Sequence, residues 1–263
     1  MVVGLDRFAE HFRDHGDRYV LIGGVATQLA LESAGVAFRA TKDLDIVLLA
    51  EALDSSFVEH FWDFVRQGRY GEQQYSSDEA NNNKRRTLYR FSKPLVQGYP
   101  AMLELFSRHP SVAPLPGTGQ LVRIAVDDAV SSLSAILLDD DYYALILANR
   151  IVRSALPVLR EEALIVLKAR AWLDLTDRKA RGEPVDSKTI RKHAMDVLRL
   201  AQLLTPATRF ALSEPLRRDV GEYLTRVAPA LKPVEVFDGV GPVRTGDALV
   251  ALALVYQIGP SQE

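Results

Sequence analysis

Hydrophobic and polar positions in the first seventy residues alternate between strand-like and helix-like patterns. Arg18 is followed by the apolar run YVLI, then by Gly23-Gly24 and a helical spacing of apolar residues. Residues 40–50 are β-branched and apolar around two aspartates, and residues 51–67 return to a helical period. Two consecutive strand–helix units are therefore expected, the first of them joined by a glycine turn.

The pattern after residue 70 adds strands and then changes to helices. Residues 70–86 are polar and predict a hairpin, and residues 87–91 and 101–106 have strand character. Beyond residue 126 the composition is almost wholly helical, and a helical period runs through residues 139–154, 160–181, 187–204 and 213–227, the third with Asp186-Ser187 as its cap. We predict an α/β N-terminal domain with a mixed sheet, residues 1–126, and an α-helical C-terminal domain, residues 127–263.

Composition narrows the class of protein. Of the 263 residues 48% are hydrophobic and 25% are charged, which is typical of a globular protein. The basic-then-apolar pattern of a secretory signal is lacking, and no apolar stretch is long enough for a bilayer, so we expect a cytoplasmic protein with no membrane partner. Cysteine is absent, so any metal must bind oxygen or imidazole. The net charge of -2 means that binding to a nucleic acid needs a local basic patch.

Acidic residues interrupt two of the expected strands. Because alternate side chains of a strand share a face, Arg39, Thr41, Asp43 and Asp45 are expected to project together. Two carboxylates at this spacing can chelate Mg²⁺, which prefers oxygen ligands. Glu104 lies in the apolar run MLELF, where a lone charge is costly unless it is paired or bound to a metal.

A structural explanation of the same residues must be weighed. With 34 acidic residues in the chain, roughly four acidic-x-acidic triplets are expected by chance. Asp43 and Asp45 would also suit the solvent-facing side of a half-buried strand, and Arg39 could pair with Asp43. Gly23-Gly24 is open to two interpretations, since a glycine pair is often only a tight turn, yet at a helix start its N–H groups favour a phosphate.

The order of these motifs resembles a known superfamily. The chain has an apolar residue followed by Gly-Gly and a helix, then the pattern h-D-h-D-h, and then h-E-h, where h is a hydrophobic residue. This order resembles that of the DNA polymerase β-like nucleotidyltransferases. Within it, LIGGVATQLALESAGVAFRATKDLDIVL is similar to the AbiEii-type nucleotidyltransferases, the toxin half of abortive-infection and toxin–antitoxin pairs. The resemblance extends to LELFSR, LKARAWLDLTDRKARGE and KHAMDVLRL. Many toxin members carry Gly-Ser where this chain has Gly23-Gly24.

The resemblance implies a metal-dependent transfer of a nucleoside monophosphate from an NTP to an acceptor. It implies that Asp43, Asp45 and Glu104 are catalytic and bind Mg²⁺ or Mn²⁺, and that the helical domain completes the cleft for NTP and acceptor. The NTP-binding residues would be Gly23, Gly24, Arg39, Thr41, Lys168, Lys192 and Asp196. The implied acceptor is tRNA or another RNA, with a possible cognate antitoxin as partner and no readout of DNA sequence.

Several of these residues also have a simpler explanation. Lys168 could cover apolar surface with its stem instead of reaching phosphates. Lys192, Asp196 and Arg199 could form a solvated ion-pair row on one helix face. His193 shares a face with Val197 and is expected to be a helix-packing residue. The basic run Lys84-Arg85-Arg86, with Tyr89, Arg90 and Phe91, suits either a polynucleotide contact or a solvated hairpin end.

Two further functions compete with an RNA nucleotidyltransferase. One is nucleotidylation of a small molecule or a protein by the same metal site. The other is a catalytically silent module that binds a nucleotide or a partner. The complete trio Asp43, Asp45 and Glu104 argues against the silent module, because a degenerate member is expected to lose at least one carboxylate.

Overall fold

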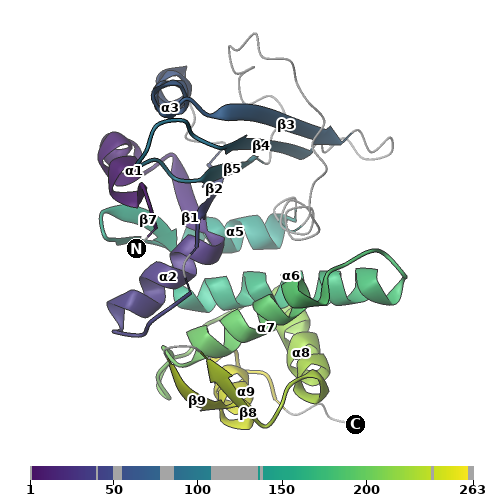
Figure 1. Ribbon diagram of the computed structural model, residues 1–263. Helices are drawn as coiled ribbons and strands as arrows, with labels where there is room; N and C mark the ends of the chain where they lie inside the picture. The colour runs from purple at the N-terminus through teal and green to yellow at the C-terminus, as the bar shows by residue number, and fades with distance from the viewer. Residues whose placement is uncertain are drawn as a thin grey trace. The chain divides into compact units, whose positions relative to one another are not determined.

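The computed structural model describes residues 2–39, 41–49, 55–77, 86–107, 136, 139–237 and 240–259. The chain divides into two compact units, coloured by residue number in Figure 1. The first comprises residues 1–26, 40–127 and 146–159, and the second residues 27–39, 128–145 and 160–263. The boundary predicted at residues 126 and 127 lies outside the described residues and stays a prediction.

The first unit is built on a mixed sheet. Within the described residues this sheet has seven strands in the order β3-β4-β5-β2-β1-β7-β6. The pairs β1–β7 and β2–β5 are parallel and the others antiparallel. The strands are β1 (Tyr19–Ile22), β2 (Asp43–Leu48), β3 (Gly71–Ser77), β4 (Arg86–Ser92), β5 (Met102–Ser107), β6 (Arg150–Arg153) and β7 (Leu156–Leu159). The predicted α/β class with a mixed sheet is therefore confirmed.

Aromatic residues hold the helices of this unit against one another and against the sheet. Phe8 of α1 (Leu5–His11) meets Tyr19 of β1 and Phe64 of α3 (Ser55–Gly68) edge to face, at centroid distances of 5.6 and 5.5 Å. Phe12 follows α1 and lies 5.5 Å from the Phe64 ring. Such buried rings supply much of the free energy that stabilises a small core.

The second unit is mainly helical. Its helices include α6 (Glu161–Ala180), α7 (Ser187–Ala201), α8 (Glu214–Val227) and α9 (Thr245–Val255). The side chain of Asp186 accepts a hydrogen bond from the Lys188 backbone N–H at 2.9 Å, so the predicted cap of α7 is confirmed. No helix in the described part of the chain is long and apolar enough to cross a membrane.

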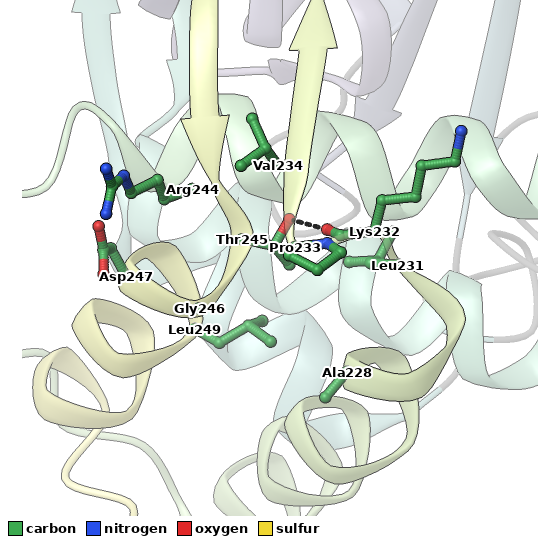
Figure 2. A pocket seen from close by; sticks show the side chains of 10 residues that line it. All are labelled: Ala228, Leu231, Lys232, Pro233, Val234, Arg244, Thr245, Gly246, Asp247 and Leu249. Carbon is green, nitrogen blue, oxygen red and sulfur yellow. Dashed lines mark hydrogen bonds between the residues drawn. The ribbon is translucent and has the colours of Figure 1, made fainter.

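Two hairpins occur where the sequence predicted only helices. The helix expected over residues 139–154 is wrong at its end, because α5 (Asp140–Ala148) stops and β6 begins at Arg150. Ser154 and Ala155 have φ of 52 and 60°, the left-handed pair that closes a two-residue hairpin. The second hairpin, β8 (Val234–Phe237) and β9 (Val240–Arg244), lies in the second unit and meets the start of α9 at a pocket (Figure 2).

Candidate functional site

The Gly23-Gly24 turn is shaped by the aspartate strand beside it. Gly23 ends the buried strand β1 with φ of +64°, and a Cβ there would lie 1.7 Å from Oδ2 of Asp45. A Cβ on Gly24 would lie 2.7 Å from Oγ1 of Thr41. Only glycine fits the first position, because both the backbone conformation and the carboxylate exclude a side chain. The glycines therefore allow the start of α2 (Gly23–Ser33) to approach Asp45 closely.

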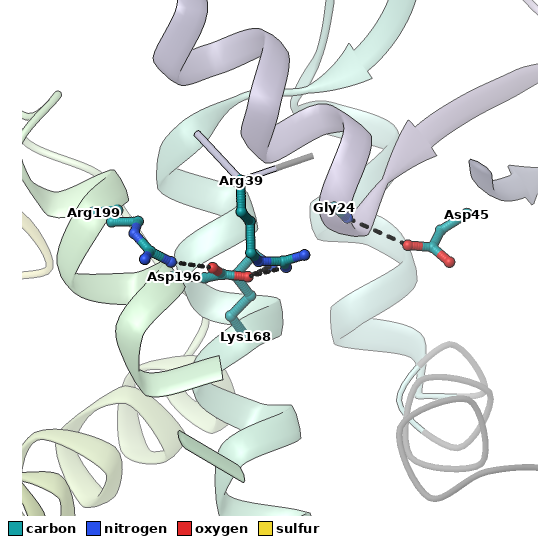
Figure 3. A network of polar contacts seen from close by, with 6 residues as sticks. All are labelled: Gly24, Arg39, Asp45, Lys168, Asp196 and Arg199. Atoms are coloured by element: carbon teal, nitrogen blue, oxygen red, sulfur yellow. Dashed lines mark hydrogen bonds and ion pairs between the residues drawn. The ribbon is translucent and has the colours of Figure 1, made fainter. Parts of the chain in front are cut away.

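The backbone N–H of Gly24 points at the carboxylate of Asp45. The Gly24 nitrogen lies 3.4 Å from Asp45 Oδ2, as Figure 3 shows. The first N–H groups of a helix have no partner within it, and the helix dipole favours an anion at this end. Here that anion is Asp45, which the sequence did not predict. The assignment of Gly23 and Gly24 to the triphosphate stays a prediction.

Strand register brings Asp45, Glu104 and Arg90 into one row across the sheet. Asp45 of β2 is paired with Glu104 of β5, and Glu104 with Arg90 of β4. The Arg90 Nε donates to Glu104 Oε1 at 2.7 Å, and the Arg90 and Glu104 side chains are only 12% and 4% exposed. The charged row therefore lies largely inside the sheet, where electrostatic interactions are stronger than in water.

The carboxyl of Glu104 has a raised pKa. Burial is the largest cause, and the nearby carboxylate of Asp45 adds to it, so that the pKa of Glu104 rises to about 8 although Arg90 opposes the shift. A carboxyl with this pKa can accept or release a proton in the neutral range.

The donors in this row suit a hard divalent cation. Asp43 and Asp45 are half-buried, whereas Leu44 between them is fully buried, so the two aspartates share one face of β2 as predicted. Their oxygen atoms, with those of Glu104, belong to the ligand class of Mg²⁺, which usually completes its shell with water and phosphate oxygens. A bound cation would also favour the ionised form of the Glu104 carboxyl. Among the described residues, no group of three or more Asp, Glu or His side chains is already arranged to hold a metal ion.

The residues before β2 do not extend the strand. It begins at Asp43, so Arg39 and Thr41 precede it instead of sharing a strand face with the aspartates. Thr41 packs against Gly24 through its hydroxyl. Arg39 stacks over the Phe38 ring at 4.9 Å and forms an ion pair with Asp196 at 3.3 Å, not the pair with Asp43 that the sequence allowed.

Asp196 is the centre of a charged cluster in the second unit (Figure 3). Its carboxylate is fully buried and accepts from Lys168 Nζ at 2.9 Å, Arg199 Nη1 at 3.2 Å and Arg39 Nη2 at 3.3 Å. The solvated ion-pair row considered from sequence is therefore wrong for Asp196. The Lys168 side chain is 7% exposed, and its ammonium group donates to Asp196. Lys192 is exposed on α7.

Positive charge controls titration in this cluster. Burial would raise the pKa of Asp196, but Lys168 and Arg39 outweigh it and lower the pKa to about 2. Burial and the charge of Lys168 lower the pKa of His193 to about 3, so its imidazole is neutral. The expected role of His193 in helix packing is consistent with this neutral state. The cluster carries one carboxylate against three cations, and hence a net positive charge.

Sequence reasoning missed two groupings. Arg90 was considered for nucleic-acid contact, whereas the structure pairs it with Glu104. The available signal was an arginine between Tyr89 and Phe91 in one strand and a lone negative charge in the next. The second is a histidine group that the sequence analysis did not predict, in which the His11 and His60 rings stack at 4.0 Å and the His15 and His60 ring centroids lie 4.6 Å apart. Of the predicted basic run, Lys84 and Arg85 lie outside the described residues.

Comparisons with known proteins add little. A scan against protein-family models and a search of curated proteins found no match. Among solved structures, the chain is similar to the Cid1 poly(U) polymerase in a mutant form bound to MgATP, with 12% identity and a TM-score of 0.28. That likeness covers 94% of this chain and 64% of the polymerase chain, so this chain spans less than two thirds of its length. The function proposed below rests on the site and not on this likeness.

Proposed function

We propose that this chain is a metal-dependent nucleotidyltransferase that moves a nucleoside monophosphate from an NTP to an acceptor. The observation that supports the proposal is the row formed by Asp45 and Glu104, in register on neighbouring strands, with Asp43 on the same face and the Gly23-Gly24 helix start against Asp45. A buried carboxylate beside a half-buried one on the neighbouring strand is unfavourable for stability alone, and the two suit a site that binds a cation and moves a proton.

The chain's residues would act on the reacting atoms in a simple order. The acceptor hydroxyl oxygen forms a bond to the α-phosphorus, and the bond from that phosphorus to the bridging oxygen breaks, so pyrophosphate leaves. The hydroxyl proton passes to one of the two carboxylates, Asp45 or Glu104. A bound Mg²⁺ or Mn²⁺ would supply positive charge to the triphosphate and to the attacking oxygen.

The finer parts of the proposal rest on sequence resemblance. It assigns the acceptor as tRNA or another RNA, the role as the toxin of a toxin–antitoxin or abortive-infection pair, and a cognate antitoxin as partner. It also assigns Arg39, Thr41, Lys168, Lys192 and Asp196 to the NTP. The net positive charge around Asp196 is compatible with a nearby anion, although Lys168 is engaged by Asp196.

The test is transfer of label from each α-³²P-labelled NTP. The protein is incubated with Mg²⁺ or Mn²⁺ and total tRNA, and the products are resolved on a denaturing gel. We expect metal-dependent label on RNA, reduced by more than about 100-fold in Asp43→Asn/Asp45→Asn, since losing a ligand costs more than losing its supporting contacts. A matched control, Asp14→Asn/Asp17→Asn, removes two exposed carboxylates of the same unit and should keep full activity.

Other results assign the function differently. Label on a protein or a small molecule, lost in Asp43→Asn/Asp45→Asn, would keep the chemistry and replace the acceptor. Nucleotide binding without transfer to any of these acceptors would indicate the silent module. Equal transfer by the double variant and the wild type would remove the aspartates from the site.

A further inference from the structure

Basic residues on the surface of the second unit fall into two groups. Most are neutralised by an acid: Arg170 pairs with Asp219 at 3.6 Å, and Arg178 with Glu183 at 2.7 Å. Arg217, Arg226 and Arg181 have acidic partners too. Lys188, Lys232 and Arg244 are exposed and have no ion-pair partner among the described residues, and the same holds for Lys179, Arg209 and Arg218, which do not line the pocket described below. Unpaired cations raise the local potential, whereas paired ones largely cancel.

Arg191, which has an acidic partner, connects Lys188 of α7 with the β8–β9 hairpin. Lys188 and Arg191 lie three residues apart on α7, and so on one helix face. Arg191 donates to the buried Glu235 of β8 at 2.8 Å, and Glu235 also accepts from the Lys232 backbone N–H at 3.2 Å. Arg244 ends β9 and lines the same pocket as Lys232. We call Lys188, Arg191, Lys232 and Arg244 the basic face.

The basic face borders a pocket of about 450 Å³ (Figure 2). Lys232 and Arg244 line it together with apolar side chains that include Leu231, Pro233 and Leu249. The Thr245 hydroxyl donates a hydrogen bond to the Lys232 carbonyl at 2.7 Å, which joins two segments that line the pocket. The volume is in the range of small-ligand sites and exceeds that of a nucleobase. An apolar pocket between two cations fits a ligand with an apolar ring and an anionic group on each side.

The charge on this face is cancelled only in part, because Glu235 neutralises Arg191 and Asp247 lines the pocket with Lys232 and Arg244. Glu235 is 5% exposed and its carboxylate is occupied by Arg191 and Lys232, so it presents little negative charge to solvent. Among the residues that line the pocket, Asp247 is the acid, and it lies beside Arg244 (Figure 2). If a nucleobase occupied the pocket, the exposed carboxylate of Asp247 would be a suitable acceptor for its exocyclic amino group.

We propose that the basic face is where the acceptor RNA docks, with phosphates on Lys188, Arg191, Lys232 and Arg244 and one unstacked nucleotide in the pocket. The choice of RNA rests on the proposed function; the charge and the pocket are independent of it. Single-stranded nucleic acids are bound in this way, by cations along the backbone and pockets or platforms for bases. Val250 and Leu254 are exposed on α9 and would favour a protein partner, such as a second copy of the chain.

The test measures RNA binding without NTP or metal. Fluorescence anisotropy of a labelled single-stranded RNA is titrated with the full chain at several salt concentrations. We expect Lys232→Glu/Arg244→Glu to weaken binding by at least about tenfold and to lower the salt slope by about 1.4, because each lost phosphate contact removes about 0.7 in single strands. The control Arg217→Glu/Arg218→Glu makes the same charge change on exposed positions of α8 and should bind within about twofold of wild type.

A second variant separates the pocket from the charge. Gly246 lines the pocket, and a Cβ there would meet no atom within 4 Å, so Gly246→Leu can be made without a clash. We expect it to weaken RNA binding several-fold and to leave the salt slope unchanged. An unaltered affinity would overturn the seating of a nucleotide in the pocket. Thermal melting of each variant verifies that it is folded.

Three outcomes would overturn the docking proposal. They are RNA binding that does not depend on salt, an equal loss of affinity in both double variants, and an unchanged affinity in Lys232→Glu/Arg244→Glu. If that variant instead loses only a concentration-dependent self-association in sedimentation, the face is a protein interface. Asp45→Asn should bind RNA as wild type does, so binding without transfer means that the proposed catalysis fails and the docking surface stands.

Discussion

At the scale of single residues, the clearest functional signal is the close approach of Gly23 to Asp45. A side chain at Gly23 is excluded twice, by its left-handed backbone and by an Asp45 oxygen 1.7 Å from the Cβ position. Gly35 has a similar φ of +73° but nothing within 4 Å of its Cβ position. Substitutions at Gly23 and Gly35 therefore distinguish strain in the backbone, which both would cause, from displacement of Asp45, which only the Gly23 substitution would cause.

We predict that Gly23→Ala and Gly35→Ala differ in activity far more than backbone strain alone allows. Each should lower the free energy of unfolding by about 1–2 kcal/mol, the cost of a left-handed non-glycine residue. Only Gly23→Ala should also displace Asp45 and abolish transfer. Chemical denaturation and the label-transfer assay measure the two effects, and equal activity in both variants would show that the glycine approach has no part in the site.

A second residue-scale prediction concerns Asp196. In Asp196→Asn the cations Lys168, Arg199 and Arg39 lose their buried counter-charge, so we expect the free energy of unfolding at pH 7 to fall by about 3–5 kcal/mol. Because the native pKa of about 2 lies below the ordinary aspartate value of 3.8, the ionised Asp196 stabilises the fold fully above pH 3.8.

That contribution should be lost as the pH falls from 3.8 to about 2. The stability of wild type and Asp196→Asn should therefore converge over this window in urea denaturation. Asp219→Asn, which changes a carboxylate elsewhere in the same unit, serves as the comparison. A constant difference between wild type and Asp196→Asn down to pH 2 would contradict the role of the buried charge.

At the scale of elements, the β6–β7 hairpin shows why a helical pattern can end early. Residues 150–153 alternate between exposed and half-buried positions, and the two residues of the turn take positive φ. Ser154 and Ala155 are poor residues for this conformation, which favours Asn-Gly. The hairpin was therefore not predicted from the sequence, because neither residue is the Asn or Gly that signals this turn.

We predict that Ala155→Gly stabilises the protein. Glycine has no steric penalty at φ of 60°, so the free energy of unfolding should rise by up to about 1 kcal/mol. Ala144→Gly on the exposed side of α5 should instead lower it by about 1 kcal/mol, because glycine is a poor helix former. Denaturant midpoints compare the two, and a loss of stability in Ala155→Gly would mean that the turn conformation is misassigned.

At the scale of the whole molecule, local patterns predicted most elements and few of the tertiary partners. The strand before Gly23, the aspartate strand and the cap at Asp186 follow from period and cap chemistry, which act over a few residues. The pairing of Asp45 with Glu104 depends on which strands are neighbours and in what register, which no local pattern specifies.

Long-range ion pairs show the same limit. Lys168 and Asp196 were singled out separately, yet their contact joins residues 28 positions apart on two helices. Arg39 reaches Asp196 across 157 positions, so the strand face predicted for Arg39 could not reveal its partner. The candidate residues were predictable as unusual charges in apolar settings, whereas their partners required the fold.

The central claim is tested most directly by pyrophosphate release. Wild type, Asp43→Asn/Asp45→Asn and Asp14→Asn/Asp17→Asn are each incubated with all four NTPs and total tRNA while Mg²⁺ is titrated from zero. We predict release that requires Mg²⁺, is equal in wild type and the Asp14/Asp17 variant, and falls by more than about 100-fold in the Asp43/Asp45 variant. Metal-independent release, or equal release by all three proteins, would contradict a metal-dependent nucleotidyltransferase site on these aspartates.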